Sequence, residues 1–311
     1  MGHARARCVG AARPDPGHPR TRPAPARRRR PALLAAGAAG ACALALGGAA
    51  IMWTGDGPVP SAAAAEVLRT AARTVAASPS LMPGPGQYYY RRAEGTTFSQ
   101  ATNADGSTGE FRRLRTSHEL WVAADGSGRV LRHDLPAAAG PGASGQMDVS
   151  LIPKEATVPF GSRALTIAQV QDLPTDPRRL ADVIREAAVR NSRPLAYQEL
   201  DLVGELLRNA PVDPELGAAL YGALSTMPGI EALGTRTDQL GRTGQAVGTV
   251  DGTGARLELV IDPRTGRLLA DRTVAVEDLH AEGLPFTPGD VMEEFTYVAQ
   301  GVVDSTGQRV R

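Results

Sequence analysis

An uninterrupted run of uncharged residues, 32–53, divides the chain into two parts with different hydrophobic patterns. The run is 22 residues long and consists mostly of Ala, Gly and Leu. As a helix, at ~1.5 Å per residue, it would extend roughly 33 Å, which is enough to cross a hydrocarbon core of ~30 Å. It is apolar on every face, which is unusual for a helix of a soluble core. The run therefore predicts one transmembrane helix, followed by a Gly/Pro linker over residues 54–60.

Beyond the linker, the chain alternates between helical and β periodicity. Helices are predicted where apolar residues recur every three or four positions, at 61–78, from Asp176-Pro177, at 197–208 and from Asp213-Pro214. Strands are predicted between Gly, Pro and Asp turns, at 87–92, 111–123, 129–134, 230–238, 245–251, 256–262, 268–276 and 291–303. Strands joined by hairpins, with a segregated helical block, are typical of α+β domains. We therefore expect residues 61–311 to form one α+β domain with an antiparallel sheet.

Charge is distributed unevenly along the chain. Residues 1–30 hold nine arginines and one acid, a net charge of +8, whereas the whole chain is +1, which leaves −7 for the remainder. The basic tail, residues 1–31, has almost nothing to bury and is expected to be disordered. Arginines directly before a spanning run keep the N-terminus in the cytoplasm, so residues 61–311 are expected outside the cell membrane, which they contact through the anchor. No aromatic or folded element accompanies the arginines, and a nucleic-acid partner is not expected.

Two alternatives to a retained anchor follow from the same segment. A cleaved signal peptide is compatible with the small residues at 60–64, although the apolar run is longer than the usual central region of such peptides. A lipoprotein would require attachment at Cys42, but residues 39–41 match a lipobox poorly. The two main alternatives, a retained anchor and a cleaved peptide, both export the domain.

The sequence offers few groups for catalysis or metal binding. Its two cysteines, Cys8 and Cys42, precede residue 54, so the exported domain can form no internal disulfide. No HExxH, GxSxG or P-loop motif is present. His118 and His133 flank a predicted hairpin, but two histidines on a strand surface are more often solvated than metal-bound. We therefore expect no cofactor, no metal and no enzymatic activity.

Three consecutive tyrosines are the candidate contacts for a ligand or partner. Strand alternation directs Tyr88 and Tyr90 to one face of their strand and Tyr89 to the other. Aromatic residues make up only 4% of the chain, so these rings and Trp121 contribute much of the available buried area. We expect a core role for Trp121 and a mixed role for the tyrosines.

Seven short segments, in order, carry a resemblance to a known family. They are PGQYYY (85–90), ELW (119–121) with the turn at Asp125, LPTDP (173–177), LYGAL (220–224), MPGI (227–230), DQLGRTGQA (238–246) and VIDPRTG (260–266). In these segments the chain resembles an actinobacterial family of uncharacterised single-pass membrane proteins, often encoded beside extracytoplasmic-function sigma factors. The resemblance implies membrane anchoring and a regulatory neighbourhood, and it supplies no catalytic residues. The short tail lacks hydrophobic periodicity and an HxxxCxxC motif, which argues against direct sigma-factor binding.

The order of elements is also similar to lipoprotein-carrier folds, in which a curved antiparallel sheet wraps around helices. The leading hypothesis is a non-enzymatic, membrane-anchored extracytoplasmic binding or sensor protein, linked to an envelope response. The alternative is a carrier or chaperone for an apolar ligand, and an enzyme comes third. A continuous apolar cavity would favour the carrier, an exposed patch a protein partner, and a cleft with convergent carboxylates an enzyme.

Overall fold

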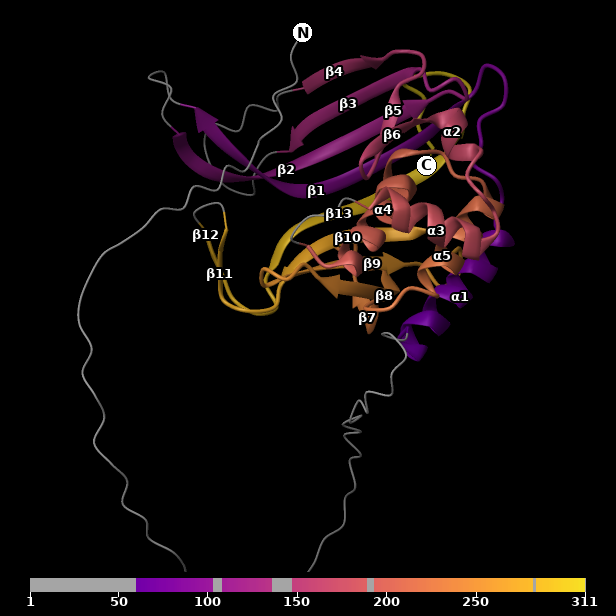
Figure 1. Ribbon diagram of the computed structural model, residues 1–311. Coiled ribbons are helices and arrows are strands. Elements are labelled where there is room, and N and C mark those ends of the chain that lie inside the picture. The colour runs from indigo at the N-terminus through magenta and orange to yellow at the C-terminus, as the bar shows by residue number, and fades with distance from the viewer. Residues whose placement is uncertain (1–59, 103–107, 136–146, 189–192, 282–283, 311) are drawn as a thin grey trace, which may run out of the picture. The chain divides into compact units, whose positions relative to one another are not determined.

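The computed structural model describes residues 60–102, 108–135, 147–188, 193–281 and 284–310 (Figure 1). These residues belong to one compact unit, which spans Trp53–Arg311. The predicted basic tail, the predicted transmembrane helix and the linker up to residue 59 lie outside the described residues. Within the described residues, no helix has both the length and the apolar character needed to cross a membrane.

Local capping signals start most of the helices where the sequence predicted them. Ser61 caps α1 (Ala62–Ala76) by accepting a hydrogen bond from the Ala64 amide at 3.3 Å. Asp176 caps α3 (Pro177–Ala187) and Asp213 caps α5 (Pro214–Leu224), each with proline in the first turn. α4 (Leu195–Asn209) follows Pro194 and has no side-chain cap. Its position therefore depends on packing, since Leu200, Val203 and Leu206 are buried in the core.

A nine-stranded antiparallel sheet forms the body of the domain and bends around the helices, which gather on one of its faces (Figure 1). Its order is β4-β3-β2-β1-β13-β10-β9-β8-β7. The strands are β1 (Tyr88–Thr102), β2 (Thr108–Val122), β3 (Gly128–Leu135), β4 (Met147–Ile152), β7 (Glu231–Thr237), β8 (Thr243–Val250), β9 (Ala255–Ile261), β10 (Leu268–Ala275) and β13 (Val291–Val303). The α+β prediction with a curved antiparallel sheet is confirmed.

Hydrophobic residues are buried on both faces of this sheet. The larger cluster fills the space between the helices and the sheet, and it includes Leu68, Ile184, Leu220 and Leu259. A smaller cluster on the opposite face contains Tyr90, Trp121, Leu131 and Val303. The C-terminal segment lies against that second cluster, since Val310 packs on it and Trp121 Nε1 donates a hydrogen bond to the backbone oxygen of Gln308 at 2.7 Å.

Several elements were not predicted from the sequence. They are β4, the β5–β6 hairpin (Thr157–Phe160 and Arg163–Thr166), α2 (Ile167–Gln171) and the β11–β12 hairpin (Leu279–Ala281 and Leu284–Phe286). All are six residues or shorter. Such short segments contain too few periods for a hydrophobic pattern to distinguish a strand from a helix or a loop.

Candidate functional site

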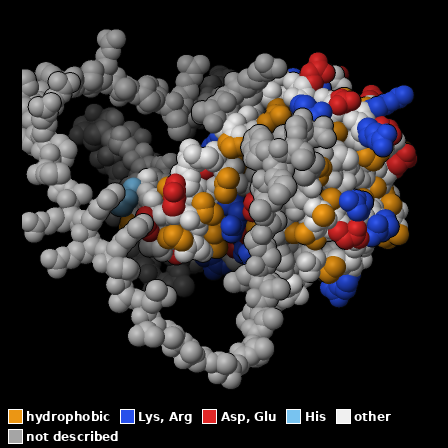
Figure 2. Space-filling view, turned by 60° about the horizontal axis from the view of Figure 1, so that its bottom comes forward, with side chains coloured by type: hydrophobic (Ala, Val, Ile, Leu, Met, Phe, Trp, Pro, Cys, Tyr) orange, Lys and Arg blue, Asp and Glu red, His pale blue; other side chains and the backbone are white. Residues whose placement is uncertain are grey.

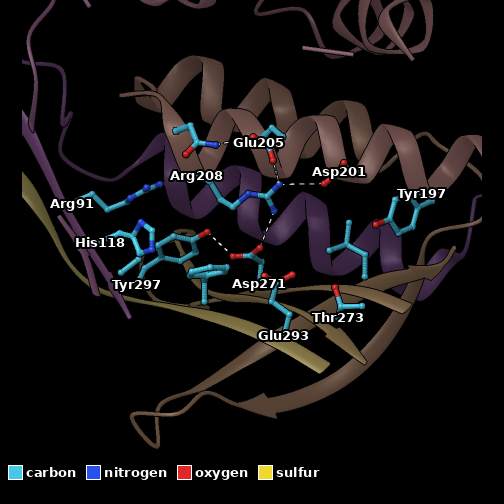
Figure 3. Close-up of a pocket in the computed structure, with 14 residues that line it drawn as sticks. Arg91, His118, Tyr197, Asp201, Glu205, Arg208, Asp271, Thr273, Glu293 and Tyr297 are labelled. Carbon is cyan, nitrogen blue, oxygen red and sulfur yellow. Dashed lines mark hydrogen bonds and ion pairs between the residues drawn. The ribbon is translucent and has the colours of Figure 1, made fainter. Parts of the chain in front are cut away.

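A cavity of about 360 Å³ lies between the helix-facing side of the sheet and α4. Five strands contribute to its wall, namely β1, β2, β9, β10 and β13. Figure 3 shows the acidic and basic side chains of α4 extending toward the strands, while Asp271, Glu293 and Tyr297 approach from the sheet. We call this cavity the polar groove.

One stripe of α4 forms the helical wall of the polar groove. Asp201, Glu205 and Arg208 are spaced by four and three residues, so they project from the same face of the helix. The opposite stripe holds the buried leucines and valine of the core. The amphipathic pattern that docks α4 therefore also directs three charged side chains at the sheet.

Arg208 is the centre of an ion network in this groove. Its Nη1 donates to Asp271 Oδ2 at 2.9 Å, and its Nη2 donates to Glu205 Oε1 at 2.6 Å and to Asp201 Oδ1 at 3.2 Å. Burial alone would lower the pKa of Arg208, but the surrounding negative charge outweighs burial and raises it. Arg208 therefore stays charged and holds strand β10 against α4.

The second carboxylate oxygens of Asp271 and Glu205 also accept hydrogen bonds. The Tyr297 hydroxyl donates to Asp271 Oδ1 at 2.6 Å, and Asn209 Nδ2 donates to Glu205 Oε2 at 2.7 Å. Burial and the adjacent charge of Asp271 raise the pKa of Tyr297, which keeps its proton for this bond. Asp271 and Glu205 are thus committed to partners within the domain.

Among the carboxylates that line the polar groove, Asp201 and Glu293 have raised pKa values. Burial raises the pKa of Glu293, and the negative charge of Asp271 raises it further, whereas Asp201 forms an ion pair with Arg208. No ion pair of Glu293 is found among the described residues. A carboxyl group with a raised pKa is suited to proton transfer, so Glu293 is the residue on which an enzymatic function would depend.

Arg91 lies at the other end of the polar groove, on β1. Its side chain is on the helix-facing side of the sheet and is 8% exposed. Its guanidinium carbon lies 5.4 Å from the centre of the Tyr297 ring, which is a cation–π distance. Its Nε and Nη1 are buried and have no hydrogen-bond partner within the described part of the chain. Buried polar groups are nearly always hydrogen-bonded, which makes this guanidinium exceptional.

His118 lines the groove beside Arg91. Its ring packs edge-on against Phe295 at 5.8 Å, and its Nε2 lies 3.2 Å from the Thr116 hydroxyl. Burial lowers the pKa of His118, and the charges of Arg132 and Arg91 lower it further. His118 is therefore neutral at pH 7 and adds no positive charge.

A second cavity, of about 390 Å³, adjoins the polar groove. The two share the side chains of Arg91, His118, Glu205 and Asn209. Apart from these, the wall of the second cavity is mainly apolar and includes Leu120, Val122, Val130, Ile152, Val158 and Ile167. We call it the apolar groove, and the two grooves meet at Arg91.

The structure separates the candidate tyrosines as strand alternation predicted. Tyr88 and Tyr90 belong to the cluster on the face away from the helices, where the Tyr90 and Trp121 rings are 5.2 Å apart. Tyr89 is on the helix-facing side and lines a small cavity of about 60 Å³. None of the three lines the polar or the apolar groove. A ligand role for Tyr88, Tyr89 and Tyr90 stays a prediction.

The two histidines named from the sequence do not form a pair. His118 is opposite Arg132 in the β2–β3 register, and His133 is opposite Ser117, so the two imidazoles point to opposite faces. Among the described residues, no group of three or more His, Cys, Asp or Glu side chains could hold a metal ion.

Arg91 and the charged stripe of α4 were not predicted from the sequence. Arg91 follows Tyr89 by two positions, so the same alternation that buries Tyr89 carries a charged residue to the helix-facing side. The spacing of Asp201, Glu205 and Arg208 was also visible, but only the apolar positions of this helix were considered. A charged residue at a strand position that alternation assigns to the buried face, as for Arg91, is the sequence pattern that would have predicted this site.

Comparisons with known proteins give weak structural similarity only. No family model matches the chain, and no curated protein matches it. The solved complex of Pseudomonas aeruginosa MucA and MucB is 14% identical over 80% of this chain and 58% of that chain, with a TM-score of 0.28. A structure of MucB alone is 15% identical over 81% of this chain and 61% of that chain, also at 0.28. This chain thus spans about three fifths of the length of the MucB chains.

A lipoprotein-sorting protein domain from Vibrio parahaemolyticus gives a similar result. It is 11% identical over 79% of this chain and 95% of that chain, with a TM-score of 0.22. At these values neither likeness supports a functional conclusion for this chain.

Proposed function

We propose that residues 60–310 form an extracytoplasmic binding module that holds an amphipathic molecule between the curved sheet and α4. The observation that supports this most is the junction of the two grooves. A polar groove of about 360 Å³ and a mainly apolar groove of about 390 Å³ share part of their walls. Ligand sites are commonly concave and mainly apolar, with a few convergent polar groups that fix orientation. A molecule with an apolar chain and a polar head would place the chain in the apolar groove and the head in the polar groove.

The apolar groove supports a carrier or sensor of such molecules rather than a binder of small polar solutes. Its apolar side chains come from β2, β3, β4, β5 and α2, which together form one side of the domain. Burying a hydrocarbon chain there would gain about 0.8 kcal/mol for each methylene removed from water. A domain anchored at the membrane would have access to such molecules.

The test is to block the apolar groove with a bulky side chain and to measure which bound compounds no longer co-purify with the protein. Val130 lines the groove on β3, so Val130→Trp would occupy it, whereas Val250→Trp adds the same ring at an exposed position on β8. The full-length protein and both variants are purified from membranes, and the co-purified small molecules are identified by mass spectrometry. We expect an amphipathic compound with the wild type and Val250→Trp that is lost from Val130→Trp. The same compounds in all three samples would contradict the proposal.

A membrane-anchored topology is the second part of the proposal. It is supported by the net charge of +8 before the uncharged run 32–53. A reporter enzyme that is active only outside the cytoplasm, fused after Arg311, should be active. A reporter that works equally well in the cytoplasm would contradict export. A mature N-terminus near Ala65 would retain export and exclude the anchor.

Catalysis is not part of this proposal. Three carboxylates of the polar groove, Asp201, Glu205 and Asp271, already contact Arg208. An enzymatic alternative depends on Glu293, and it predicts that Glu293→Gln abolishes turnover of a bound compound without releasing it. Recovery of the same unmodified compound from the wild type and from Glu293→Gln would exclude that alternative.

A protein partner is a second candidate function, favoured by one edge of the sheet. β4 is the last strand on its edge, and two of its side chains are exposed, Val149 at 46% and Leu151 at 83%. Unpaired backbone groups and alternate apolar side chains are the features to which an added strand binds. Cross-linking from position 151 in membranes should capture a partner if this edge is used, and Leu151→Lys should prevent the capture.

A further inference from the structure

Among the described residues, no counterion is found for the positive charge of Arg91. The residue lies in the middle of the nine-stranded sheet, opposite Leu120 on β2 and Gln300 on β13. Both neighbouring strands hold its backbone, so the direction in which the side chain leaves the sheet is set by the ladder. Figure 3 shows the side chain extending into the groove toward α4, above His118 and Tyr297.

Two carboxylates that line the polar groove together with this guanidinium, Glu205 and Asp271, are bound to other residues. Glu205 lines both grooves, but its two oxygens accept from Arg208 and Asn209. Asp271 uses its two oxygens for Arg208 and Tyr297. The Nε and Nη1 of Arg91 are buried and have no hydrogen-bond partner among the residues that the structure describes. A buried, uncompensated charge is costly, and a bound anion would offset that cost.

The contacts that Arg91 does make leave room for such an anion. One face of the guanidinium lies over the Tyr297 ring at 5.4 Å, which leaves the planar edge with its N–H groups free to donate. An arginine edge matches the oxygens of a carboxylate or a phosphate. Both grooves are open beside it, and the one that continues past Leu120 and Val122 is mainly apolar.

We propose that Arg91 binds the acidic head group, a carboxylate or phosphate, of an amphipathic ligand whose hydrocarbon chain occupies the apolar groove. This inference rests on the proposed function, which it deepens by naming the ligand class and the residue that recognises it. The head group would receive hydrogen bonds from the Arg91 guanidinium, and the chain would lie against Leu120, Val130 and Ile152.

The test measures binding of compounds that differ only in charge or chain. The full-length protein is reconstituted in nanodiscs of phosphatidylcholine, which has no net charge. Dodecanoate and dodecyl phosphate carry both head and chain, dodecanol carries the chain alone, and acetate and inorganic phosphate carry the anion alone. Affinities are determined by competition with a fluorescent fatty-acid probe and, for the short anions, by calorimetry.

The variant Arg91→Gln keeps hydrogen-bond donors and removes the charge, and Arg264→Gln removes a charge at an exposed turn as the matched control. We expect dodecanoate and dodecyl phosphate to bind Arg91→Gln at least tenfold more weakly than the wild type, with dodecanol unchanged. Arg264→Gln should bind all compounds as the wild type does. Equal affinity of the wild type and Arg91→Gln for the acidic compounds would overturn the inference and leave the proposed function standing.

Two further outcomes distinguish a failure of the proposed function from a failure of the ligand class. If none of the three long-chain compounds binds the wild type, the proposed function fails and the inference fails with it. If inorganic phosphate binds as tightly as dodecyl phosphate and loses the same factor in Arg91→Gln, the site recognises a free anion, and the amphipathic ligand is overturned.

Thermal melting of the wild type and Arg91→Gln distinguishes a loss of binding from a loss of folding. Without ligand, Arg91→Gln should melt at the same or a higher temperature than the wild type, because it removes an unpaired buried charge. Dodecanoate should raise the melting temperature of the wild type and not that of the variant. A variant that melts lower without ligand would show that Arg91 is compensated within the protein, which overturns the inference.

Discussion

Replacing Trp121 by alanine tests whether the face of the sheet away from the helices carries a true second core. Trp121 is 1% exposed, its ring lies 5.2 Å from that of Tyr90, and its Nε1 donates to the Gln308 oxygen at 2.7 Å. A buried tryptophan removes roughly 200 Å² from water, which at about 25 cal/mol per Å² amounts to ~5 kcal/mol. Observed costs of replacing Phe or Trp by Ala in cores are about 3–5 kcal/mol. We expect a loss of about 4 kcal/mol in the free energy of unfolding.

The assay is urea denaturation followed by far-ultraviolet circular dichroism, which does not depend on the fluorescence of the ring that is removed. For a domain of about 250 residues, this loss corresponds to a fall in melting temperature of roughly 10 °C. Trp121→Phe is the matched control, because it keeps an aromatic ring against Tyr90 and loses the hydrogen bond to Gln308. That variant should lose about 1–2 kcal/mol. An unchanged midpoint for Trp121→Ala would refute burial of this strand face and would require the sheet around β2 to be redrawn.

Three other expectations concern single groups in the domain. Asp271→Asn should lower the unfolding free energy by about 2 kcal/mol in the same urea assay because Arg208 loses a buried charged partner, and an unchanged midpoint would contradict this. Burial and neighbouring arginines lower the pKa of His118 below 6.5, so the unfolded chain binds its proton first as the pH falls. The wild type should therefore lose stability relative to His118→Gln below pH 6.5, and equal midpoints of the two proteins at pH 5 would contradict this sign. Melting should not respond to a reducing agent, because Cys8 and Cys42 both precede the domain, and a lower melting temperature under reduction would show a cross-link involving one of them.

The C-terminal segment contributes a second polar contact to the face that Trp121 occupies. Arg309 donates two hydrogen bonds to Glu119, at 2.6 and 2.8 Å, and Tyr90 donates a third at 2.8 Å. Burial alone would raise the pKa of Glu119, but these hydrogen bonds outweigh it and lower the pKa. Trp121, Tyr90 and the Arg309–Glu119 ion pair therefore join the C-terminal segment to this face, whereas the opposite face carries the grooves.

The outer surface offers few other features that point to function. On the face that Figure 2 shows, Arg, Asp and Glu side chains are interspersed with small groups of hydrophobic ones. A mixture of both signs is typical of a solvated surface and favours no single class of charged partner. The concentration of unusual groups in the grooves is the reason for placing the binding site there.

Much of the local structure could be predicted from the sequence, because it depends on residues that are close along the chain. Asp176 and Asp213 cap their helices through amides three positions ahead, at 2.9 and 2.8 Å. Asp251 likewise accepts hydrogen bonds from the amides of Thr253 and Ala255 and closes the turn between β8 and β9. Interactions of this range are visible in a single sequence, and so are the periodicities that led to the α+β class.

The candidate site could be predicted only in part, and the tyrosines show why. Alternation assigned Tyr88 and Tyr90 to one face and Tyr89 to the other, which the structure confirms. It could not tell which face lies against the helices, because that depends on where the helical block packs. The choice of the tyrosines as contacts therefore overlooked Arg91, which shares its face with Tyr89.

The sequence by itself determined the class of fold, the capped helices, the turns, the absence of a disulfide from the domain and the charge asymmetry around residues 32–53. Only the tertiary structure decided the strand order, in which β1 pairs with β13 although Tyr88 and Val303 are 215 positions apart. That pairing brings Arg91 to Tyr297, and the packing of α4 brings Arg208 to Asp271. Capping and turn formation depend on residues that are close in the sequence, so they can be recognised there. A cavity is formed by residues that are far apart in the sequence and come together only in the folded domain. That Arg91 has no counterion among the described residues becomes visible only once the strands and helices around it have been placed.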